Sequence, residues 1–256
     1  MRDAETRRLL ARCRDAGIGA LCESARLSTA VNARVFGSAA ETVWLAAGET
    51  FRFGDRASAC RIARLERGAL TTEVVGSGPV SGLVGVWLPG DIVGLDTLAG
   101  DGPDETIRAA TDSVLRAVTG QFFQRVRATE PRVANAVDRL IGRELRRRAQ
   151  QCRVVCRCDA DQRLAIFLLS LLCRTSPTVG LSCQLELTVS RTSIADLLGL
   201  RLETLSRKFG MLEYDGVIDL QGPRVVLIDG AALTRRAGVA EEPLTGATQL
   251  EPISRP

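Results

Sequence analysis

The sequence predicts an α+β protein in three successive parts: a domain of short strands, one long helix, and a pair of helices followed by a hairpin. Between residues 42 and 123, short apolar runs are punctuated by glycine, which is typical of about eight strands folded as a jelly-roll-like barrel. Residues 125–157 carry apolar side chains at helical spacing. Residues 190–228 follow the order helix, turn, helix, hairpin, which indicates a winged helix-turn-helix.

The helix-turn-helix pattern lies at residues 190–216, SRTSIADLLGLRLETLSRKFGMLEYDG. We expect Ser190 or Thr192 to cap the first helix, and Gly199 to end it because a left-handed backbone favours glycine. The two short strands that follow, joined around Gly222, form the wing. In the second helix an apolar stripe marks the packed face: Leu202, Leu205, Phe209 and Leu212.

The other face of the second helix carries the groups that recognise a major groove. Arginine can bond both acceptors on a guanine edge, a carboxylate accepts from the cytosine amino group, and serine or threonine can bond bases or phosphates. A solvated helix face without a partner is the alternative interpretation. We expect DNA contacts from this set: Thr192, Arg201, Glu203, Thr204, Ser206, Arg207 and Lys208.

The segment SIADLLGLRLETLSRKFGMLEYDGVI, residues 193–218, resembles the DNA-binding segment of the Crp/Fnr family of bacterial transcription regulators. Within it, ETLSR is similar to the recognition-helix signature, with Glu203, Ser206 and Arg207 at the base-reading positions of the Fnr branch. The resemblance implies a homodimer that recognises a palindromic site with TTGAT-like half-sites. It also implies a sensory, cyclic-nucleotide-binding-like β-roll and contact with RNA polymerase, for which the turn at residues 76–82 is a candidate.

These patterns divide the chain as follows: an N-terminal extension at 1–27, the sensory β-roll at 28–124, a dimerisation helix at 125–158, the winged-helix DNA-binding domain at 159–234, and a tail at 235–256. We expect the tail to be disordered because its proline, glycine and polar residues show no period. By the resemblance, the long helix packs against its copy in a parallel dimer. Arginines at 146–148 interrupt its apolar stripe. The expected dimer interface is Val133, Val137, Leu140, Ile141, Leu145, Cys152 and Val155.

Eight cysteines and no histidine limit the chemistry of the chain. The lack of histidine removes His-based catalytic triads, His-containing zinc sites and His-ligated haem. The stretch CRDAGIGALC resembles the N-terminal cysteine motif with which the Fnr branch binds a [4Fe-4S] cluster, with Cys13 and Cys22 in its first and last places. Ala16 and Arg116 stand where the other two ligands belong. Because such a cluster generally needs four thiolates, we expect no intact [4Fe-4S] cluster and no metal.

The thiols nevertheless leave alternatives open. Cys13 and Cys22 are either a relic or an oxidisable pair, and a second group, Cys152, Cys156 and Cys158, either packs or takes part in redox control. The other three cysteines, Cys60, Cys173 and Cys183, show no ligand spacing. The alternative functions are therefore a regulator controlled directly by thiol oxidation, or a cysteine-dependent oxidoreductase or metal-binding protein. We do not expect an enzyme, because there is no CxxC motif and no evident general base beside a thiol.

The β-roll sequence argues against a cyclic nucleotide. Cyclic-nucleotide binders of the family hold the phosphate with an Arg-Ser pair on the strand that here is DETIRAAT, and Glu105 and Thr106 fill those places. A glutamate repels a phosphate, and Arg108, two positions on, lies at a different depth. The chain also lacks an apolar run long enough for a membrane span and an N-terminal signal-peptide core, so we expect a cytoplasmic protein.

Overall fold

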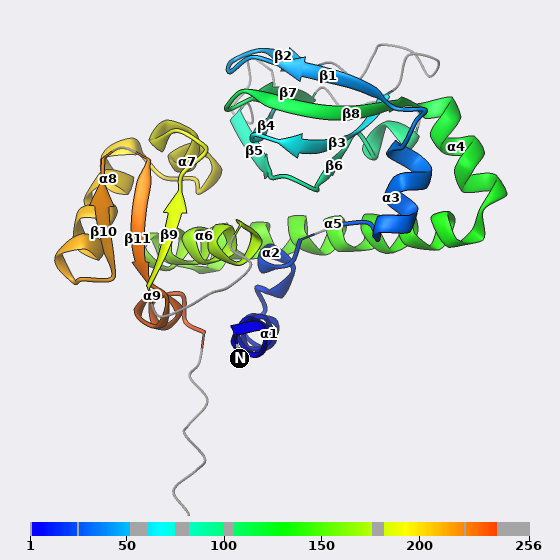
Figure 1. Cartoon of the computed structure of the whole chain (residues 1–256). Helices are drawn as coiled ribbons and strands as arrows, with labels where there is room; N and C mark the ends of the chain where they lie inside the picture. Colours follow the sequence, from blue (N-terminus) through cyan, green and yellow to red (C-terminus); the bar gives the residue numbers. More distant parts are fainter. Residues whose placement is uncertain are drawn as a thin grey trace, which may run out of the picture.

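The computed structural model describes residues 2–24, 26–51, 61–74, 82–99, 105–175, 182–222 and 224–239. A β-roll and a C-terminal helical domain lie side by side along one long helix, α5 (Pro131–Arg157), and α6 (Ala160–Thr175) follows at its end (Figure 1). Two N-terminal helices, α1 (Arg2–Asp15) and α2 (Gly19–Cys22), lie on the opposite side of the long helix from the β-roll. Among the described residues, no helix combines the length and the hydropathy that a bilayer span requires.

In its described residues, the β-roll has two four-stranded antiparallel sheets, ordered β1-β8-β3-β6 and β2-β7-β4-β5. Side chains alternate between its interior and exterior, as the twofold period of a strand requires: Ile107 and Ala109 of β7 share one buried cluster with Leu115 and Ala117 of β8. The expected jelly-roll-like barrel is therefore confirmed. The strands are β1 (Glu41–Leu45), β2 (Thr50–Phe51), β3 (Arg61–Arg67), β4 (Leu70–Val74), β5 (Gly82–Trp87), β6 (Ile92–Val93), β7 (Glu105–Ala109) and β8 (Ser113–Thr119), with a short 3-10 helix, η1 (Asp96–Ala99), after β6.

The helix expected from residue 125 onward is in fact two helices, α4 (Gly120–Thr129) and α5. They meet at Glu130, whose extended backbone (φ −125°, ψ 99°) precedes Pro131 at the first position of α5. Proline lacks the N–H that would continue a helix, and it pushes the preceding residue out of the helical region. A further helix, α3 (Thr29–Phe36), packs against the first half of α5.

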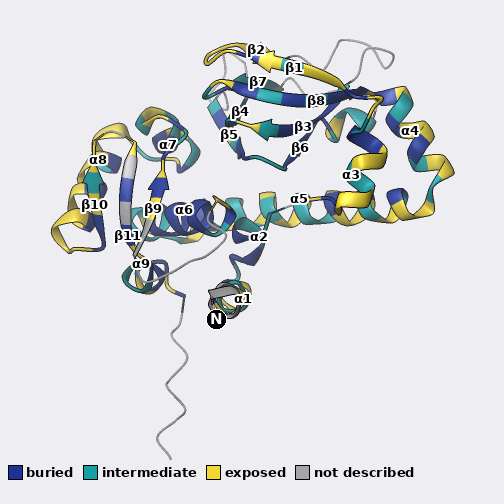
Figure 2. Ribbon diagram, viewed as in Figure 1, coloured by how far each residue is buried: buried dark blue, intermediate teal, exposed yellow. Residues whose placement is uncertain are grey.

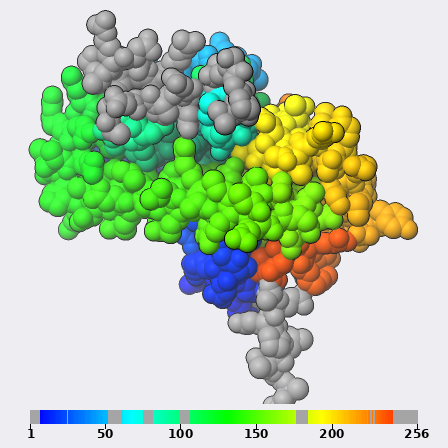
Figure 3. All heavy atoms as spheres, turned by 180° about the vertical axis from the view of Figure 1, so that it is seen from behind, coloured from blue at the N-terminus to red at the C-terminus, as the bar shows by residue number. Residues whose placement is uncertain are grey.

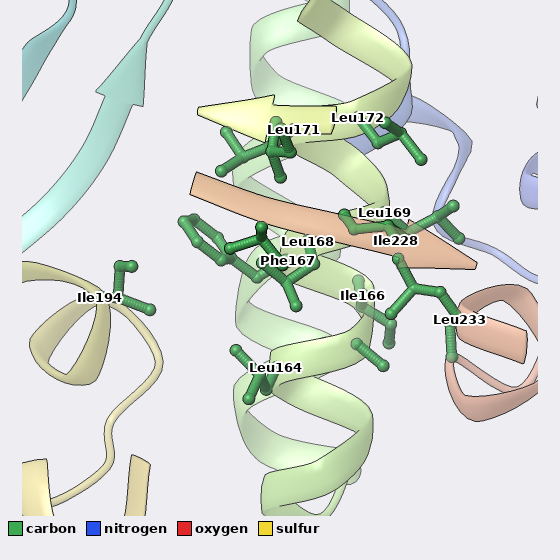
Figure 4. Packing of buried hydrophobic residues seen from close by; sticks show 14 of the residues in the cluster. Leu164, Ile166, Phe167, Leu168, Leu169, Leu171, Leu172, Ile194, Ile228 and Leu233 are labelled. Atoms are coloured by element: carbon green, nitrogen blue, oxygen red, sulfur yellow. The ribbon is translucent and has the colours of Figure 1, made fainter. Parts of the chain in front are cut away.

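The C-terminal domain is a winged helix-turn-helix, as expected. Its elements are α6, β9 (Ser182–Glu186), α7 (Arg191–Leu197), α8 (Leu202–Tyr214), β10 (Ile218–Gln221), β11 (Val225–Asp229) and α9 (Gly230–Arg236), with the sheet order β10-β11-β9. Figure 4 shows α6 as the central helix, with Ile194, Ile228 and Leu233 packed around its leucines.

Two features of this domain differ from expectation. The strand β9, SCQLE, was not expected from the sequence. It forms by antiparallel pairing with β11. The tail was expected to begin at residue 235, but α9 continues to Arg236, and Val239 is buried. Residues 240–256, where most of the expected tail lies, are outside the described residues.

The N-terminal extension is part of the core of the C-terminal domain. Leu9, Cys13, Ile18 and Cys22 belong to the same buried cluster as the leucines of α6. Figure 2 shows α2 in the colours of buried and intermediate residues, and Figure 3 shows α1 in blue and α9 in orange-red together beneath the green long helix. The buried cluster therefore joins the N-terminal helices to α6, the central helix of the C-terminal domain.

Candidate DNA-binding surface and cysteine cluster

An N-cap on α7 and a hydrogen bond from α6 to the turn stabilise the helix-turn-helix. The hydroxyl of Ser190, outside α7, accepts the N–H of Ser193 at 3.0 Å, so Ser190 is the N-cap and the exposed Thr192 is not. Gly199 takes the left-handed conformation in the turn, with φ +61°. The guanidinium of Arg163 on α6 donates to the carbonyl oxygen of Leu198 at 3.0 Å, which fixes the turn against α6.

The packed face of α8 is formed by Leu205, Phe209 and Leu212, which are all buried. Leu202 was expected to join them, but its side chain is exposed because it stands at the first residue of the helix, beyond the packed surface. The guanidinium of Arg191 on α7 lies 3.2 Å from the centroid of the Phe209 ring. Burial lowers the pKa of Arg191, and this cation–π contact locks α7 onto α8.

The polar face of α8 is exposed. Glu203, Ser206 and Arg207 are separated by three and four residues and so lie on one face, with Arg201 exposed just before the helix. Among the described residues, none of these four side chains has a hydrogen bond or an ion pair. Their donors and acceptors are therefore available to a ligand.

Two residues of the expected DNA-contacting set are placed differently. The ammonium group of Lys208 donates to a carboxylate oxygen of Asp161 on α6 at 2.9 Å, and the lysine side chain is mostly buried. Lys208 follows the exposed Arg207 and precedes the buried Phe209, so it lies at the edge of the packed face and joins α8 to α6. Thr204, one turn before Lys208, is half-buried at the same edge.

Comparison with known proteins identifies this architecture. A family described as the Crp-like helix-turn-helix domain matches residues 162–236, from α6 to α9. The transcriptional activator protein FnrA of Stutzerimonas stutzeri is 28% identical over 235 residues, which are 90% of this chain and 94% of FnrA. The transcriptional regulatory protein Btr of Bordetella pertussis is 33% identical over 171 residues, 67% of this chain and 71% of Btr. The chain belongs to the Crp/Fnr family.

The structure of FixK2 from Bradyrhizobium japonicum has the same fold. It superposes with a TM-score of 0.69 at 23% identity, covering 80% of this chain and 98% of FixK2. The protein is thus a DNA-binding transcription regulator of Crp/Fnr type, and its named relatives are regulators rather than enzymes.

Two arginines of the β-roll in this Crp/Fnr regulator form hydrogen bonds within the chain. Arg108 donates from Nε to both carboxylate oxygens of Glu73, each at 3.1 Å, and from Nη1 to the carbonyl oxygen of Gly48 at 2.9 Å. Arg116, in the place of the β-roll cysteine, donates to the carbonyl oxygens of Phe36 and Gly37 at the end of α3. Its guanidinium thus caps a helix.

The remaining candidate sites of the β-roll are less complete in the structure. The side chain of Glu105 lies outside the described residues. So does the turn at residues 76–82, except for Gly82, which begins β5.

The expected dimer interface divides into two faces of α5. Val133, Val137 and Leu140 are buried within the protomer, where they pack with Val35, Phe36 and other residues of the β-roll side. They are not available to a partner, which corrects the expectation for these three. The apolar stripe of the sequence was wide enough for both faces, and the β-roll covers one of them.

The other face of α5 stays open at Ile141, Leu145 and Cys152, which are exposed. The arginines at 146–148 do not all interrupt it, because Arg147 turns to the β-roll, donating to the carbonyl oxygen of Val86 at 2.7 Å and lying 5.4 Å from the Trp87 ring centroid. Val155 is half-buried against the turn of the helix-turn-helix. A Cβ at Gly199 would lie 3.5 Å from its Cγ1.

A cluster that the sequence did not predict brings Cys173 together with Cys13 and Cys22. The three sulfur atoms lie within 4.8 Å of one another. Hydrogen bonds from Cys173 and Cys22 lower the pKa of Cys13 to about 4. Hydrogen bonds with Cys13 and Cys173 raise the pKa of Cys22, and the hydrogen bond with Cys13 raises the pKa of Cys173 to about 12.

The sequence showed no ligand spacing at Cys173, but the fold places its sulfur beside those of Cys13 and Cys22. No spacing rule could have found it, because the chain separates it from Cys22 by the whole β-roll and α5. Of the second thiol group, Cys152 and Cys156 are exposed and Cys158 is half-buried. Cys60 and the side chain of Cys183 lie outside the described residues.

Proposed function

We propose that this regulator is a homodimer that reads a palindromic site with TTGAT-like half-sites through α8. The observation that carries the proposal is the exposed face formed by Glu203, Ser206 and Arg207, which have no partner among the described residues, on a helix whose other side is packed. The arginine supplies paired donors for a guanine edge, and the glutamate accepts from a cytosine amino group. A side chain held this way reads bases without first breaking a contact of its own.

The dimer forms through the open face of α5. Steps of four, three and four residues separate Ile141, Leu145, Arg148 and Cys152, which is the spacing of the a and d positions of a heptad repeat. The carboxylate of Glu144 lies 3.5 Å from the Arg148 guanidinium and balances its positive charge. We call this open face of α5, at Ile141, Leu145, Arg148 and Cys152, the seam. A parallel pair of α5 helices would present two copies of α8 to half-sites about one helical turn of DNA apart.

The seam is coupled to the recognition helix through Arg163. Its Nε donates to the carbonyl oxygen of Cys158 at the end of α5 at 2.9 Å, while its Nη1 holds the turn at Leu198. A rotation of one α5 against its copy therefore carries the helix-turn-helix with it. RNA polymerase is the protein partner that the DNA-bound dimer would contact, with the turn at 76–82 as the candidate surface.

The test is a band-shift series with the full chain. The reference duplex carries two TTGAT half-sites, and a matched set replaces each base pair of one half-site. Arg207→Ala should weaken binding to the reference by about 1–3 kcal/mol and relax discrimination at one base pair. Arg132→Ala, an exposed arginine at the other end of α5, is the control and should leave the pattern unchanged. A loss that is equal on all duplexes would show that Arg207 contacts only phosphates and would refute base recognition at this position.

A further inference from the structure

Three cysteines from three helices meet in one place. Cys13 lies in the last turn of α1, Cys22 ends α2, and Cys173 lies in the last turn of α6. Cys13 and Cys22 have exposed fractions of 0% and 1%, and all three sulfurs lie within 4.8 Å of one another. The cluster joins the N-terminal helices to the first helix of the DNA-binding domain.

The backbone is shaped for this convergence. Gly17 takes a left-handed conformation (φ +76°), and the N–H of Ile18 donates to the carbonyl oxygen of Cys13 at 2.9 Å, which reverses the chain after α1. Gly19 then lets α2 close on α1, because a Cβ there would lie 2.4 Å from Cγ of Arg14. The N–H of Ala20 donates to Oε1 of Gln150 at 2.8 Å, which holds α2 on α5. These contacts hold the backbone around Cys13 and Cys22 in place.

We propose that Cys13, Cys22 and Cys173 bind a single thiophilic metal ion of the Cu(I) or Zn²⁺ class through three sulfurs. A metal–sulfur distance of about 2.3 Å places the sulfurs of a three- or four-coordinate centre roughly 3.8–4.0 Å apart. The observed cluster lies within 4.8 Å, so binding needs only a small contraction. Soft thiolate ligands select these ions over hard cations.

The site differs from a four-thiolate iron–sulfur cluster in number and in origin of its ligands. Among the described residues, only these three supply ligand atoms to the group, and the third comes from the DNA-binding domain. Three sulfurs satisfy Cu(I), whereas Zn²⁺ would complete a tetrahedron with a solvent or buffer ligand. A disulfide is the competing chemistry, but it would use two of the three thiols and leave the third without a role.

Binding changes no oxidation state. Three metal–sulfur bonds form, and the protons that the thiols carry pass to solvent or buffer. Because two of the thiols are enclosed, the ion would be shielded from bulk water once bound. The bound ion would connect α1, α2 and α6 by bonds that the metal-free protein lacks.

The experiment uses the full chain, reduced and freed of metal under anaerobic conditions. Cd²⁺ alone is titrated as the optical probe, and the sulfur-to-cadmium absorption band gives the stoichiometry and the number of thiolates. We expect one equivalent per chain with three thiolates. Separate titrations with Zn²⁺ and with Cu(I), each in competition with a chelator of known affinity, then identify the preferred ion.

Matched triple variants decide which thiols act. The triple variant Cys13→Ser/Cys22→Ser/Cys173→Ser should no longer bind one equivalent of Cd²⁺. The triple variant Cys152→Ser/Cys156→Ser/Cys158→Ser should still bind it. Single alanine variants at Cys13, Cys22 and Cys173, first checked by circular dichroism for native folding, should each bind at least about tenfold more weakly.

Three results would overturn the proposal: unchanged binding in a folded variant of the cluster, loss of binding only in the Cys152/Cys156/Cys158 control, or a disulfide within the cluster that survives mild reductant and blocks binding. All measurements are made without DNA, so they stand or fall separately from the proposed recognition site.

Discussion

The ion pair between Arg174 of α6 and Asp91 of the β-roll gives a sharp test of how the two domains are held together. The two side chains are 4% and 3% exposed, and the guanidinium donates directly to the carboxylate. In Arg174→Met, the carboxylate of Asp91 would keep only the N–H of Leu88, at 2.8 Å, among the hydrogen bonds seen in the described residues. Removing one partner of a buried ion pair leaves the other charge buried without a counter-charge, here the carboxylate of Asp91. We therefore expect the free energy of unfolding to fall by about 3–5 kcal/mol.

The assay is urea unfolding at fixed protein concentration, followed by the fluorescence of the two tryptophans, one of which, Trp87, lies in the β-roll core. Asp91→Asn/Arg174→Met removes both charges and should recover most of the loss. Arg127→Met is the control, because its pair with Asp138 at 2.7 Å is solvent-accessible, with side chains 32% and 58% exposed, and should contribute less than about 1 kcal/mol. A loss below about 1 kcal/mol in Arg174→Met, equal to the control, would refute the reasoning.

The pH dependence of this ion pair has a defined sign. Burial lowers the pKa of Arg174 to about 10, so the native state releases this proton before the unfolded state does. The unfolded state therefore binds more protons above about pH 10, and the contribution of Arg174 to stability rises with pH there. Between pH 6 and 9 the guanidinium is charged in both states, and the difference between wild type and Arg174→Met should not change through titration of Arg174.

Three further outcomes are expected. Leu145→Glu places like charges at the proposed seam and should shift the protein to monomers in analytical ultracentrifugation, whereas Asn135→Glu, exposed on α5, should not. Gly199→Ala should lower the free energy of unfolding by about 1–2 kcal/mol in urea, because its φ of +61° is strained for alanine although its Cβ meets nothing closer than 3.5 Å. Arg163→Gln removes bonds of 2.9 and 3.0 Å and should weaken binding to the palindrome about tenfold while changing a single half-site less, as fluorescence anisotropy would measure.

The sequence was sufficient for the elements whose form depends on near neighbours. Leu205, Phe209 and Leu212 recur at helical spacing, and they are the buried face of α8. Gly199 ends α7 because the turn needs a positive φ, a requirement that the residue type itself records. The wing follows from two short apolar runs around a glycine.

The sequence was insufficient wherever two surfaces compete for one helix. The period of α5 identifies apolar positions but not which of them the β-roll covers, so Val137 and Leu145 were given the same role although one is enclosed and the other is open. Lys208 has the charge that DNA attracts, but Asp161, 47 positions earlier, already pairs with it. The partner of Cys13 and Cys22 comes from α6, and only the folded chain brings it to them.

These contacts converge on α6, and this convergence determines how a signal would travel. Near its start Asp161 pairs with Lys208 and Arg163 holds the turn at Leu198, whereas its last turn carries Cys173 beside Arg174. An ion bound at the cysteine cluster would therefore act on the same helix that orients α8, next to the salt bridge that joins this helix to the β-roll. A ligand shifts a conformational equilibrium only by its differential affinity for the two states. The cluster meets this condition only if the three sulfurs separate when α6 moves, and Arg174→Met, which frees that end of α6, should therefore weaken Cd²⁺ binding without touching a sulfur.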